Sequence, residues 1–240
     1  MLYLASVFLV VLLIRSVFQA LCSRKKTDII PALAFESLTR YYDVVVSWTC
    51  REETFKTALV HQVEQIVSLE ALVTVLDVGC GTGTLLKMLF KARPQAKLHG
   101  LDADSTVLDL ARGKLGEQVV FAKGFAHEMP FANASMDIVT SSLFFHHLTT
   151  NQKRNALTEI RRLLRSGGTL HVADWGKPSN LLMRLAFFFI QLLDGFETTR
   201  DSVTGLLPQL MTDAGFVDVS CTSSFSTVFG TIRLFKCTAP

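Results

Sequence analysis

Apolar and polar residues after residue 70 follow two alternating patterns. Short continuous apolar runs, typical of strands buried in a parallel sheet, alternate with segments whose apolar residues recur at helical spacing. The runs predict strands at 74–79, 97–104, 118–124, 135–145, 167–175, 216–224 and 231–239. The helical segments lie at 84–93, 105–115, 151–164 and 203–215, with Ser105 as N-cap of the second. Strands that alternate with helices predict βαβ units, a largely parallel sheet and an α/β fold.

The first 22 residues depart from this pattern because they are almost wholly apolar. The stretch 2–22 carries one charge, Arg15, and as a helix it would be roughly 31 Å long, about the hydrocarbon thickness of a bilayer. No basic residues precede it, and Leu21 stands where a signal-peptide cleavage site needs a small residue, so we expect the segment to be retained. The basic "SRKK" follows it, and the positive-inside rule then places the rest of the chain in the cytoplasm.

Two other interpretations of residues 1–26 stay open. Arg15, Gln19, Ser23 and Lys26 share helical spacing, which would make the second half amphipathic and bury the segment in the plane of one leaflet. The other interpretation is a helix that packs on the domain itself. We expect membrane association, either single-pass or monotopic.

Charge and cysteine content argue against a nucleic-acid partner and give no support for a metal site. The net charge is +3, but four basic residues precede the first acid, and the rest of the chain has 20 basic and 21 acidic residues. A nearly neutral domain argues against a nucleic-acid partner, which requires clustered basic charge. The five cysteines are scattered, and no CxxC or Cys/His ligand spacing occurs. We therefore expect reduced thiols and no metal site.

The stretch "VLDVGCGTGTL" (75–85) points to a ligand site at the end of a strand. An apolar run containing Asp77 leads into three glycines, Gly79, Gly81 and Gly83. Glycines allow a sharp turn and let a ligand touch the backbone. The spacing is GxGxG, whereas dinucleotide sites use GxGxxG. Asp77 suits a cationic ligand better than a pyrophosphate, and Asp102, at the end of the next strand, can accept hydrogen bonds from both ribose hydroxyls of an adenosine.

Five segments in this order resemble the successive motifs of class I S-adenosylmethionine-dependent methyltransferases. They are "VLDVGCGTGTL", "GLDAD", "AHEMPFANASMDIVTSSLFFHHL", "LLRSGGTLHVADW" and "DAGFVDV". The group most similar to them includes quinone-biosynthesis and related small-molecule or lipid methyltransferases. The likeness implies a Rossmann-like, doubly wound sheet of seven strands with a late antiparallel strand, preceded here by the N-terminal hydrophobic helix. It also implies S-adenosylmethionine as the cofactor.

The resemblance implies where this cofactor lies. The glycine loop meets the methionine part, Asp102 meets the ribose, "KGFAHEMPF" flanks the adenine, and Ser141 and Ser142 line the methionine side. Cys80 is a small filler within the loop. The expected cofactor-binding residues are Asp77, Gly79, Cys80, Gly81, Gly83, Asp102, Ala103, Phe125, Ala126 and Ser141.

One position departs from the family pattern. The family often has an acid directly after the glycine of the third strand, where it bonds the adenine amine, and here that position is Phe125. Adenine would then be held by stacking, by backbone around Ala126 and by His127. With this departure, a second interpretation stays open, in which the site binds the cofactor but does not catalyse methyl transfer.

Methyl transfer from a sulfonium needs mainly alignment and exclusion of water, because the methyl group is already activated. A general base is needed only where the acceptor must lose a proton. The candidates are His146, His147, Asp174 and either Tyr41 or Tyr42. His146 is our candidate catalytic residue, with a loop or helix-start histidine as the alternative, and we expect His147 to be structural.

One segment precedes the expected core at 71–240, and another is an insert within it. Residues 27–70 resemble the family's N-terminal helical cap, which would place Tyr41 or Tyr42 over the cofactor, although packing aromatics are the competing interpretation. The insert at 180–200 has an apolar run too short to span a bilayer. In this fold such an insert commonly covers the acceptor pocket, and its three consecutive phenylalanines, Phe187, Phe188 and Phe189, indicate an apolar acceptor. Ordinary packing of a helix on the core is the alternative.

Three functions from different classes follow. The leading one is a membrane-associated methyltransferase whose partners are the bilayer and a small apolar or lipid-like acceptor. The second is a membrane-anchored, non-catalytic assembly or regulatory factor that binds S-adenosylmethionine, and Phe125 supports it. A nicotinamide-dependent reductase is third, and the glycine spacing argues against it. The oligomeric state stays open.

Overall fold

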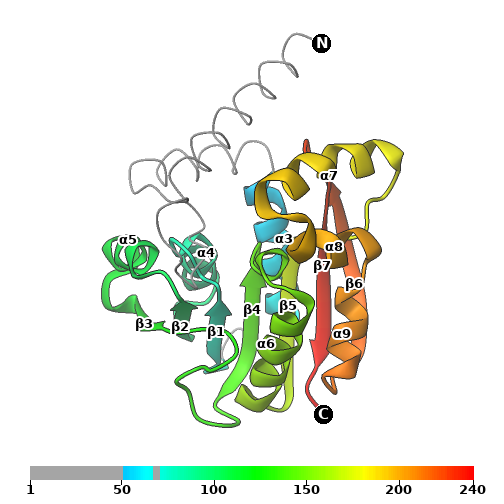
Figure 1. Cartoon of the computed structure of the whole chain (residues 1–240). Helices are drawn as coiled ribbons and strands as arrows, with labels where there is room; N and C mark the ends of the chain where they lie inside the picture. The colour runs from blue at the N-terminus through cyan, green and yellow to red at the C-terminus, as the bar shows by residue number, and fades with distance from the viewer. Residues whose placement is uncertain (1–50, 67–70) are drawn as a thin grey trace. The chain divides into compact units, whose positions relative to one another are not determined.

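Seven strands of the computed structural model form one mixed sheet (Figure 1). The structure describes residues 51–66 and 71–240. Across the sheet the strands run in the order β3-β2-β1-β4-β5-β7-β6. Their bounds are β1 Thr74–Val78, β2 Lys97–Asp102, β3 Val119–Lys123, β4 Met136–Ser142, β5 Leu164–Trp175, β6 Val217–Ser226 and β7 Thr231–Thr238. β7 runs antiparallel to both β5 and β6, and the other neighbours pair in parallel, which confirms the expected sheet.

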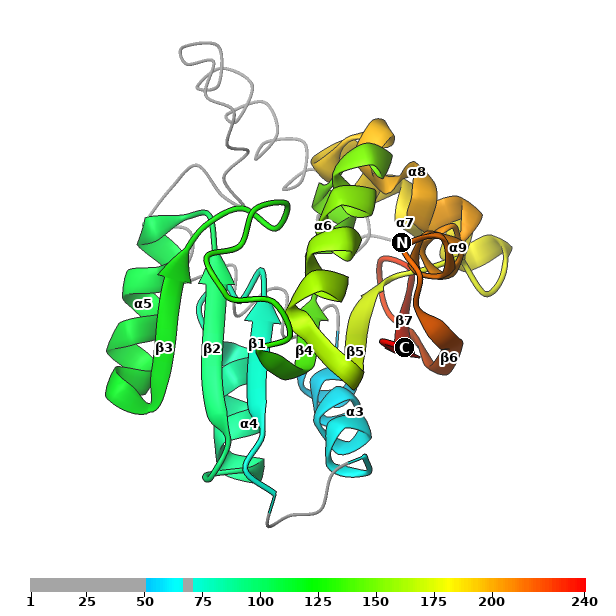
Figure 2. The same cartoon turned by 90° about the horizontal axis from the view of Figure 1, so that it is seen from below.

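Helices cover both faces of this sheet (Figures 1 and 2). They are α3 Glu52–Glu64, α4 Thr84–Ala92, α5 Ser105–Leu115, α6 Thr150–Leu163, α7 Leu181–Asp194, α8 Phe196–Thr204 and α9 Leu207–Asp213, with the short 3₁₀ helices η1 Gly116–Gln118 and η2 Phe145–His147. The helices α3, α4 and α5 share one buried apolar cluster, and α6 and α9 share the other.

The central strand β1 explains why its sequence is a continuous apolar run. Val75 packs into the same cluster as Leu59 of α3, whereas Leu76 and Val78 pack with Leu157 of α6. Successive side chains of a strand point to opposite faces. A strand covered on both faces therefore needs apolar residues at consecutive positions.

The N-cap predicted for α5 is wrong by one residue. Ser105 is the first residue of the helix, and the carboxylate of Asp104 accepts the N–H of Thr106 at 2.8 Å. Both residue types cap helices well, so the sequence pattern alone does not separate them.

The helix predicted at 203–215 is interrupted in the structure. Gly205 adopts φ +75°, and the N–H groups of Gly205 and Leu206 both bond the carbonyl of Asp201, which ends α8. Pro208 then lies in the first turn of α9, where its missing N–H costs nothing. A left-handed glycine followed by a proline is a typical helix boundary, and it produces two short helices here.

The topology places a ligand site between β1 and β4. The chain leaves β1 toward β2 and β3, and then returns to the opposite side of β1 as β4. Such a reversal opens a crevice at the carboxyl ends of the strands. The arrowheads of β1 and β4 in Figure 1 point toward the end of the sheet where α7 lies.

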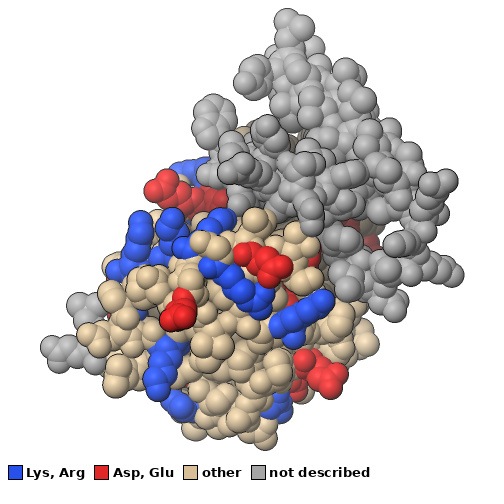
Figure 3. All heavy atoms as spheres, turned by 90° about the vertical axis from the view of Figure 1, so that its left-hand side faces the viewer, with Lys and Arg blue, Asp and Glu red and all other residues tan. Residues whose placement is uncertain are grey.

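Several sequence-based expectations fall outside this part of the chain. The N-terminal segment 1–26, most of the cap at 27–70, and Tyr41 and Tyr42 lie outside the described residues. Among the residues that are described, no helix has both the length and the apolar character to cross a membrane. Basic and acidic side chains are interspersed on the face that Figure 3 shows.

Candidate functional site

The glycine-rich loop joins β1 to α4 at the topological switch point. Gly79, Gly81 and Gly83 have φ values of +70°, +50° and +78°, a region that side chains disfavour. The N–H groups of Gly79 and Cys80 donate to the carbonyl of Leu101 at 2.9 and 3.0 Å. These bonds hold the loop against the end of β2.

Two of these glycines differ in what surrounds them. A Cβ at Gly79 would lie 2.8 Å from the Cβ of Phe144 and closer still to its ring, whereas a Cβ at Gly81 would meet no atom within 4 Å. Packing within the protein therefore demands glycine at position 79. The space beside Gly81 leaves bare backbone accessible to a ligand.

Asp102 ties the glycine loop to the end of β2. Its Oδ2 accepts the N–H of Gly81 at 2.9 Å, and its Oδ1 accepts the N–H of Asp104 at 3.0 Å. Burial raises the pKa of this carboxyl, and the two N–H groups oppose that effect. Each carboxylate oxygen can accept a second hydrogen bond, so the side chain can still receive two ribose hydroxyls.

Asp77 lies inside the sheet just before the loop. It is 1% exposed and accepts the hydroxyl of Thr140, on the neighbouring β4, at 2.9 Å. Burial raises its pKa from 3.8 to about 7, although the bond from Thr140 opposes the change. A cationic group beside it would favour the ionised form. The ammonium of an amino-acid ligand is such a group.

We expect binding of the predicted cofactor to weaken as the pH falls below 7. Asp77 attracts an ammonium group only in its ionised form, and the pKa of this side chain before binding is about 7. The dissociation constant should rise about tenfold between pH 8 and pH 6. Calorimetric titration at several pH values measures this, and Asp77→Asn should bind more weakly and flatten the dependence. An equally steep dependence in Asp77→Asn would contradict the assignment.

The same carboxyl links stability to pH. The pKa of Asp77 is raised on folding from 3.8 to about 7. Protonation therefore stabilises the ligand-free protein, fully below pH 3.8. That contribution is lost as the pH rises through about 7. Thermal stabilisation by the cofactor should consequently be greater at pH 8 than at pH 6.

Two serines end β4 beside the loop. The hydroxyl of Ser141 is buried and donates to the carbonyl of Val78 at 2.9 Å, so it joins β4 to β1. The hydroxyl of Ser142 is buried without a hydrogen-bond partner among the described residues. A buried hydroxyl in that state is costly unless a ligand or water completes it. Ser142 is therefore the better candidate of the two for a polar ligand contact.

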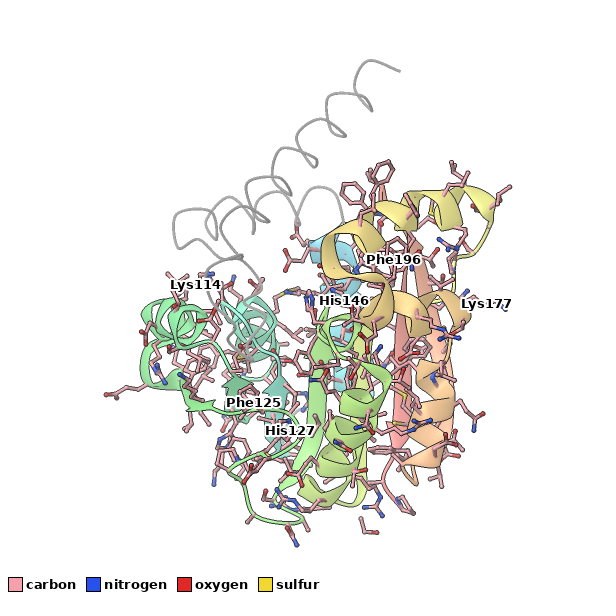
Figure 4. All side chains as sticks on the ribbon, in the orientation of Figure 1. Lys114, Phe125, His127, His146, Lys177 and Phe196 are labelled. Carbon is pink, nitrogen blue, oxygen red and sulfur yellow. The ribbon has the colours of Figure 1, made fainter. Side chains whose placement is uncertain are left out.

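The segment after β3 carries the residues expected around the adenine. Figure 4 shows Phe125 and His127 together on this segment. Their rings stack with centroids 5.5 Å apart and planes 24° apart, and Phe125 is 45% exposed, whereas Ala126 is buried. Ala103 follows Asp102 on the adjacent loop. An exposed ring supported from behind can stack on a flat ligand.

Phe125 should contribute to cofactor affinity without supporting the fold. Because its ring is 45% exposed, Phe125→Ala should leave the melting temperature nearly unchanged. Lost stacking should weaken cofactor binding by about 1–3 kcal/mol, and Phe125→Asp should be tolerated or even bind more tightly. Fluorescence titration and thermal unfolding measure the two effects. If Phe125→Asp unfolds the protein, Phe125 belongs to the core and the interpretation fails.

A second polar group lies under α7, apart from the adenine side (Figure 4). It includes His146 of η2, Asp174 near the end of β5 and Asp194 at the end of α7. Nδ1 of His146 lies 2.7 Å from Oδ1 of Asp174, and Nε2 of His146 lies 3.6 Å from Oδ2 of Asp194. His147 stacks at an angle against His146, with ring centroids 4.0 Å apart.

Burial and charge set the ionisation of these side chains. Burial lowers the pKa of His146, but Asp174 and Asp194 outweigh it and the net shift is upward. Burial raises the pKa of Asp174, yet His146 brings it below its usual value. Burial raises the pKa of Asp194. Burial and the neighbouring His146 lower the pKa of His147 to about 3. His147 is therefore neutral at physiological pH.

The insert expected to cover the acceptor is the helix α7. Asn180 caps it by accepting the N–H of Met183 at 2.9 Å. Phe187 is buried with its ring 5.5 Å from that of Trp175, which anchors one side of the helix to the end of β5. Its other side is exposed and apolar, with Leu181 74% exposed.

The structure groups most of the predicted residues and adds two, Thr140 and Asp194. Asp77, the glycine loop, Cys80 and Asp102 meet at the ends of β1 and β2. His99 lies within β2 and His171 within β5. Sequence reasoning missed Thr140, which binds Asp77, and Asp194, which faces His146, and it did not single out the unpaired hydroxyl of Ser142. The apolar pattern around Asp194 carries no signal for its position opposite His146.

Comparison with known proteins identifies the family. The model of a methyltransferase domain matches residues 75–168. An uncharacterized methyltransferase of Synechocystis is 30% identical over 145 residues, 60% of this chain and 67% of that protein. Demethylmenaquinone methyltransferase of Thermotoga maritima is 34% identical over 107 residues, but the match covers only 44% of each chain.

Solved structures of low identity share the fold. The S-adenosylmethionine-dependent methyltransferase of Aquifex aeolicus has a TM-score of 0.55 at 20% identity, with 75% of this chain and 89% of that chain covered. Phosphoethanolamine N-methyltransferase 2 of Haemonchus contortus, solved with S-adenosylmethionine, has a TM-score of 0.60 at 15% identity, with 77% and 52% covered.

The residues present fit the cofactor of this family. Buried Asp77 suits the ammonium group of the cofactor, and Asp102 suits its ribose. The backbone at Gly81 is open to a ligand, and the buried hydroxyl of Ser142 has a hydrogen bond left to make. This fit agrees with the relatives and with the matched domain. The chain belongs to the S-adenosylmethionine-dependent methyltransferases.

Proposed function

We propose that this protein methylates a small apolar or lipid-like acceptor at a membrane surface. The observation that carries the proposal is the exposed apolar face of α7 and the start of α8, on the helix whose last residue, Asp194, lies near His146. We call this surface the α7 face, and it consists of Leu181, Leu182, Leu185, Phe188 and Phe196. Soluble proteins rarely expose apolar side chains grouped in this way unless the patch binds something.

The site's own residues supply binding and alignment. When bound, S-adenosylmethionine supplies a methyl group activated by a sulfonium. Asp77 and Asp102 would hold its ammonium and ribose groups, and the glycine loop would approach it through backbone. The helix α7 would exclude water above the reacting atoms. Alignment and exclusion of water supply most of what this displacement requires.

The names of the relatives are compatible with an apolar acceptor. The Thermotoga maritima protein is named for demethylmenaquinone, and the Hahella chejuensis relative, 32% identical over 120 residues, is named for ubiquinone and menaquinone biosynthesis. The match covers 47% of the Hahella protein, so its substrate is an analogy for this chain. An apolar ring compound would suit the α7 face.

Membrane association completes the proposal. Residues 2–22 are almost wholly apolar and "SRKK" follows them, so the proposed location is a membrane with the catalytic domain facing the cytoplasm. The segment would span the bilayer or lie in one leaflet. Either arrangement would keep the catalytic domain close to an acceptor dissolved in lipid.

A variant starting at Thr27 tests the role of the membrane. We expect it to bind S-adenosylmethionine like the full chain and to methylate a water-soluble acceptor analogue. Transfer to an acceptor embedded in vesicles should fall about 10²-fold or more, because the effective concentration at the bilayer is lost. Label from methyl-labelled cofactor, extracted with the lipid, measures the transfer. Equal transfer by both proteins would contradict membrane anchoring.

Charge placed on the α7 face tests the carrying observation separately. In the full chain, Leu185→Lys combined with Phe188→Lys should reduce transfer to an embedded acceptor while leaving cofactor binding intact. Leu110→Lys, on the exposed side of α5, is the matched control. If the control and the double variant behave alike, the α7 face does not meet the acceptor's environment.

A further inference from the structure

Donor atoms from two elements converge where α7 ends. His146 and His147 come from η2, and Asp194 is the last residue of α7. Nε2 of His146 lies 3.6 Å from Oδ2 of Asp194, and Nδ1 of His147 lies 3.9 Å from Oδ1. One donor atom of each residue lies within 4.8 Å of the other two. Two imidazoles and a carboxylate form a donor set typical of transition-metal ions.

Asp174 provides an independent observation that points to a ligand. Its carboxylate accepts the N–H groups of Phe144, His146 and Trp175 at 3.1, 3.3 and 2.7 Å, so its position is determined by backbone. It lies 2.7 Å from Nδ1 of His146. A carboxylate bonded to one nitrogen of a histidine orients the ring and leaves the other nitrogen free for a metal. In this structure the other nitrogen faces Asp194.

The spacing of the donors suits a small divalent ion. Zinc bonds of about 2.0–2.2 Å place tetrahedral ligand atoms roughly 3.3 Å apart. The two distances to Asp194, 3.6 and 3.9 Å, run to different oxygens of its carboxylate, and one donor atom from each of the three residues lies within 4.8 Å of the other two. Side-chain rotations would have to bring these three donor atoms closer together to reach tetrahedral spacing. Three protein ligands also leave one coordination position open, as in catalytic rather than structural zinc sites.

We propose that His146, His147 and Asp194 bind a divalent transition-metal ion, for which zinc is the best fit, with Asp174 as the outer carboxylate. The open position would take water or an oxygen atom of the acceptor. The ion would also join η2 to the end of α7. The competing arrangement has no metal and holds a protonated His146 between Asp174 and Asp194.

Metal titration of the full-length protein decides between them. After treatment with a chelator and dialysis, the protein is titrated with Zn²⁺ by calorimetry and with Co²⁺ by visible absorption. We expect one ion per chain and the intense visible bands of tetrahedral cobalt. Asp174→Asn should weaken binding roughly 10–100-fold, and His147→Asn and Asp194→Asn should weaken it further. Each of these readouts is independent of methyl transfer.

A matched control lies on α3. His61→Asn removes a histidine whose Nδ1 lies 3.6 Å from a carboxylate oxygen of Glu64, and it should leave metal affinity unchanged. X-ray absorption of the zinc-loaded wild-type protein needs no variant and should show two imidazoles with oxygen ligands. Absence of binding, sulfur among the ligands, or unchanged affinity in folded Asp194→Asn would overturn the proposal.

Discussion

Asp102→Ala should weaken S-adenosylmethionine binding at least about 100-fold, the largest effect that we expect on cofactor affinity. The substitution removes the acceptor for the ribose and also the bond that the carboxylate receives from the N–H of Gly81. Losing charge-assisted hydrogen bonds in a buried site costs roughly 3 kcal/mol or more, which corresponds to that factor. Equilibrium dialysis with labelled cofactor measures the dissociation constant.

The matched control is Asp109→Ala. Asp109 is exposed on α5 and pairs with Arg112 three residues later, so its loss should leave affinity unchanged. Asp102→Asn, which keeps the shape and loses the charge, should fall between the wild type and Asp102→Ala. If folded Asp102→Ala binds the cofactor with wild-type affinity, Asp102 does not bind the ribose.

Gly79→Ala should lower the free energy of unfolding by about 2–4 kcal/mol, the largest effect that we expect on stability. The new Cβ would overlap the ring of Phe144, and the residue would keep φ +70°, which side chains disfavour. Gly81→Ala lacks the clash and should cost about 1 kcal/mol. Chemical denaturation of both variants measures the difference.

Gly81→Ala should lose little stability but should lose cofactor affinity. In Gly81→Ala the methyl group occupies space that the protein leaves empty, so cofactor affinity should fall although the fold persists. Equal free energies of unfolding of the two variants would show that the Phe144 side chain can move away from a Cβ at position 79 at little energetic cost. Unchanged cofactor affinity in Gly81→Ala would show that the ligand does not approach the backbone there.

The sequence was sufficient to predict the sheet and the position of the glycine loop and Asp102 at the strand ends because these depend on local patterns, whereas their contacts with the cofactor stay predictions. Continuous apolar runs mark strands buried on both faces, and the glycines of 79–83 together with Asp102 follow from the ends of β1 and β2. Capping was harder to predict, because Asp104 and Ser105 are both good N-caps. The break at Gly205 was missed because the apolar spacing continues through it.

Other parts of the candidate site depend on contacts between residues far apart in the chain. His146 and Asp174 were separate candidates in the sequence, and no local spacing relates them to Asp194. Packing of Phe187 against Trp175 brings the end of α7 over η2. Thr140 meets Asp77 because β4 pairs with β1 in a register that the sequence does not reveal. The catalytic role of His146 remains a prediction.

Turnover of the methyl group tests the central claim most directly. Full-length protein in lipid vesicles is incubated with methyl-labelled S-adenosylmethionine and a total lipid and metabolite extract, and label in organic-soluble products is counted against the amount of protein. We expect many labelled product molecules per protein chain, and background label with Asp102→Ala. Tight cofactor binding with no transfer from any extract fraction would contradict catalysis and favour the non-catalytic, membrane-anchored factor.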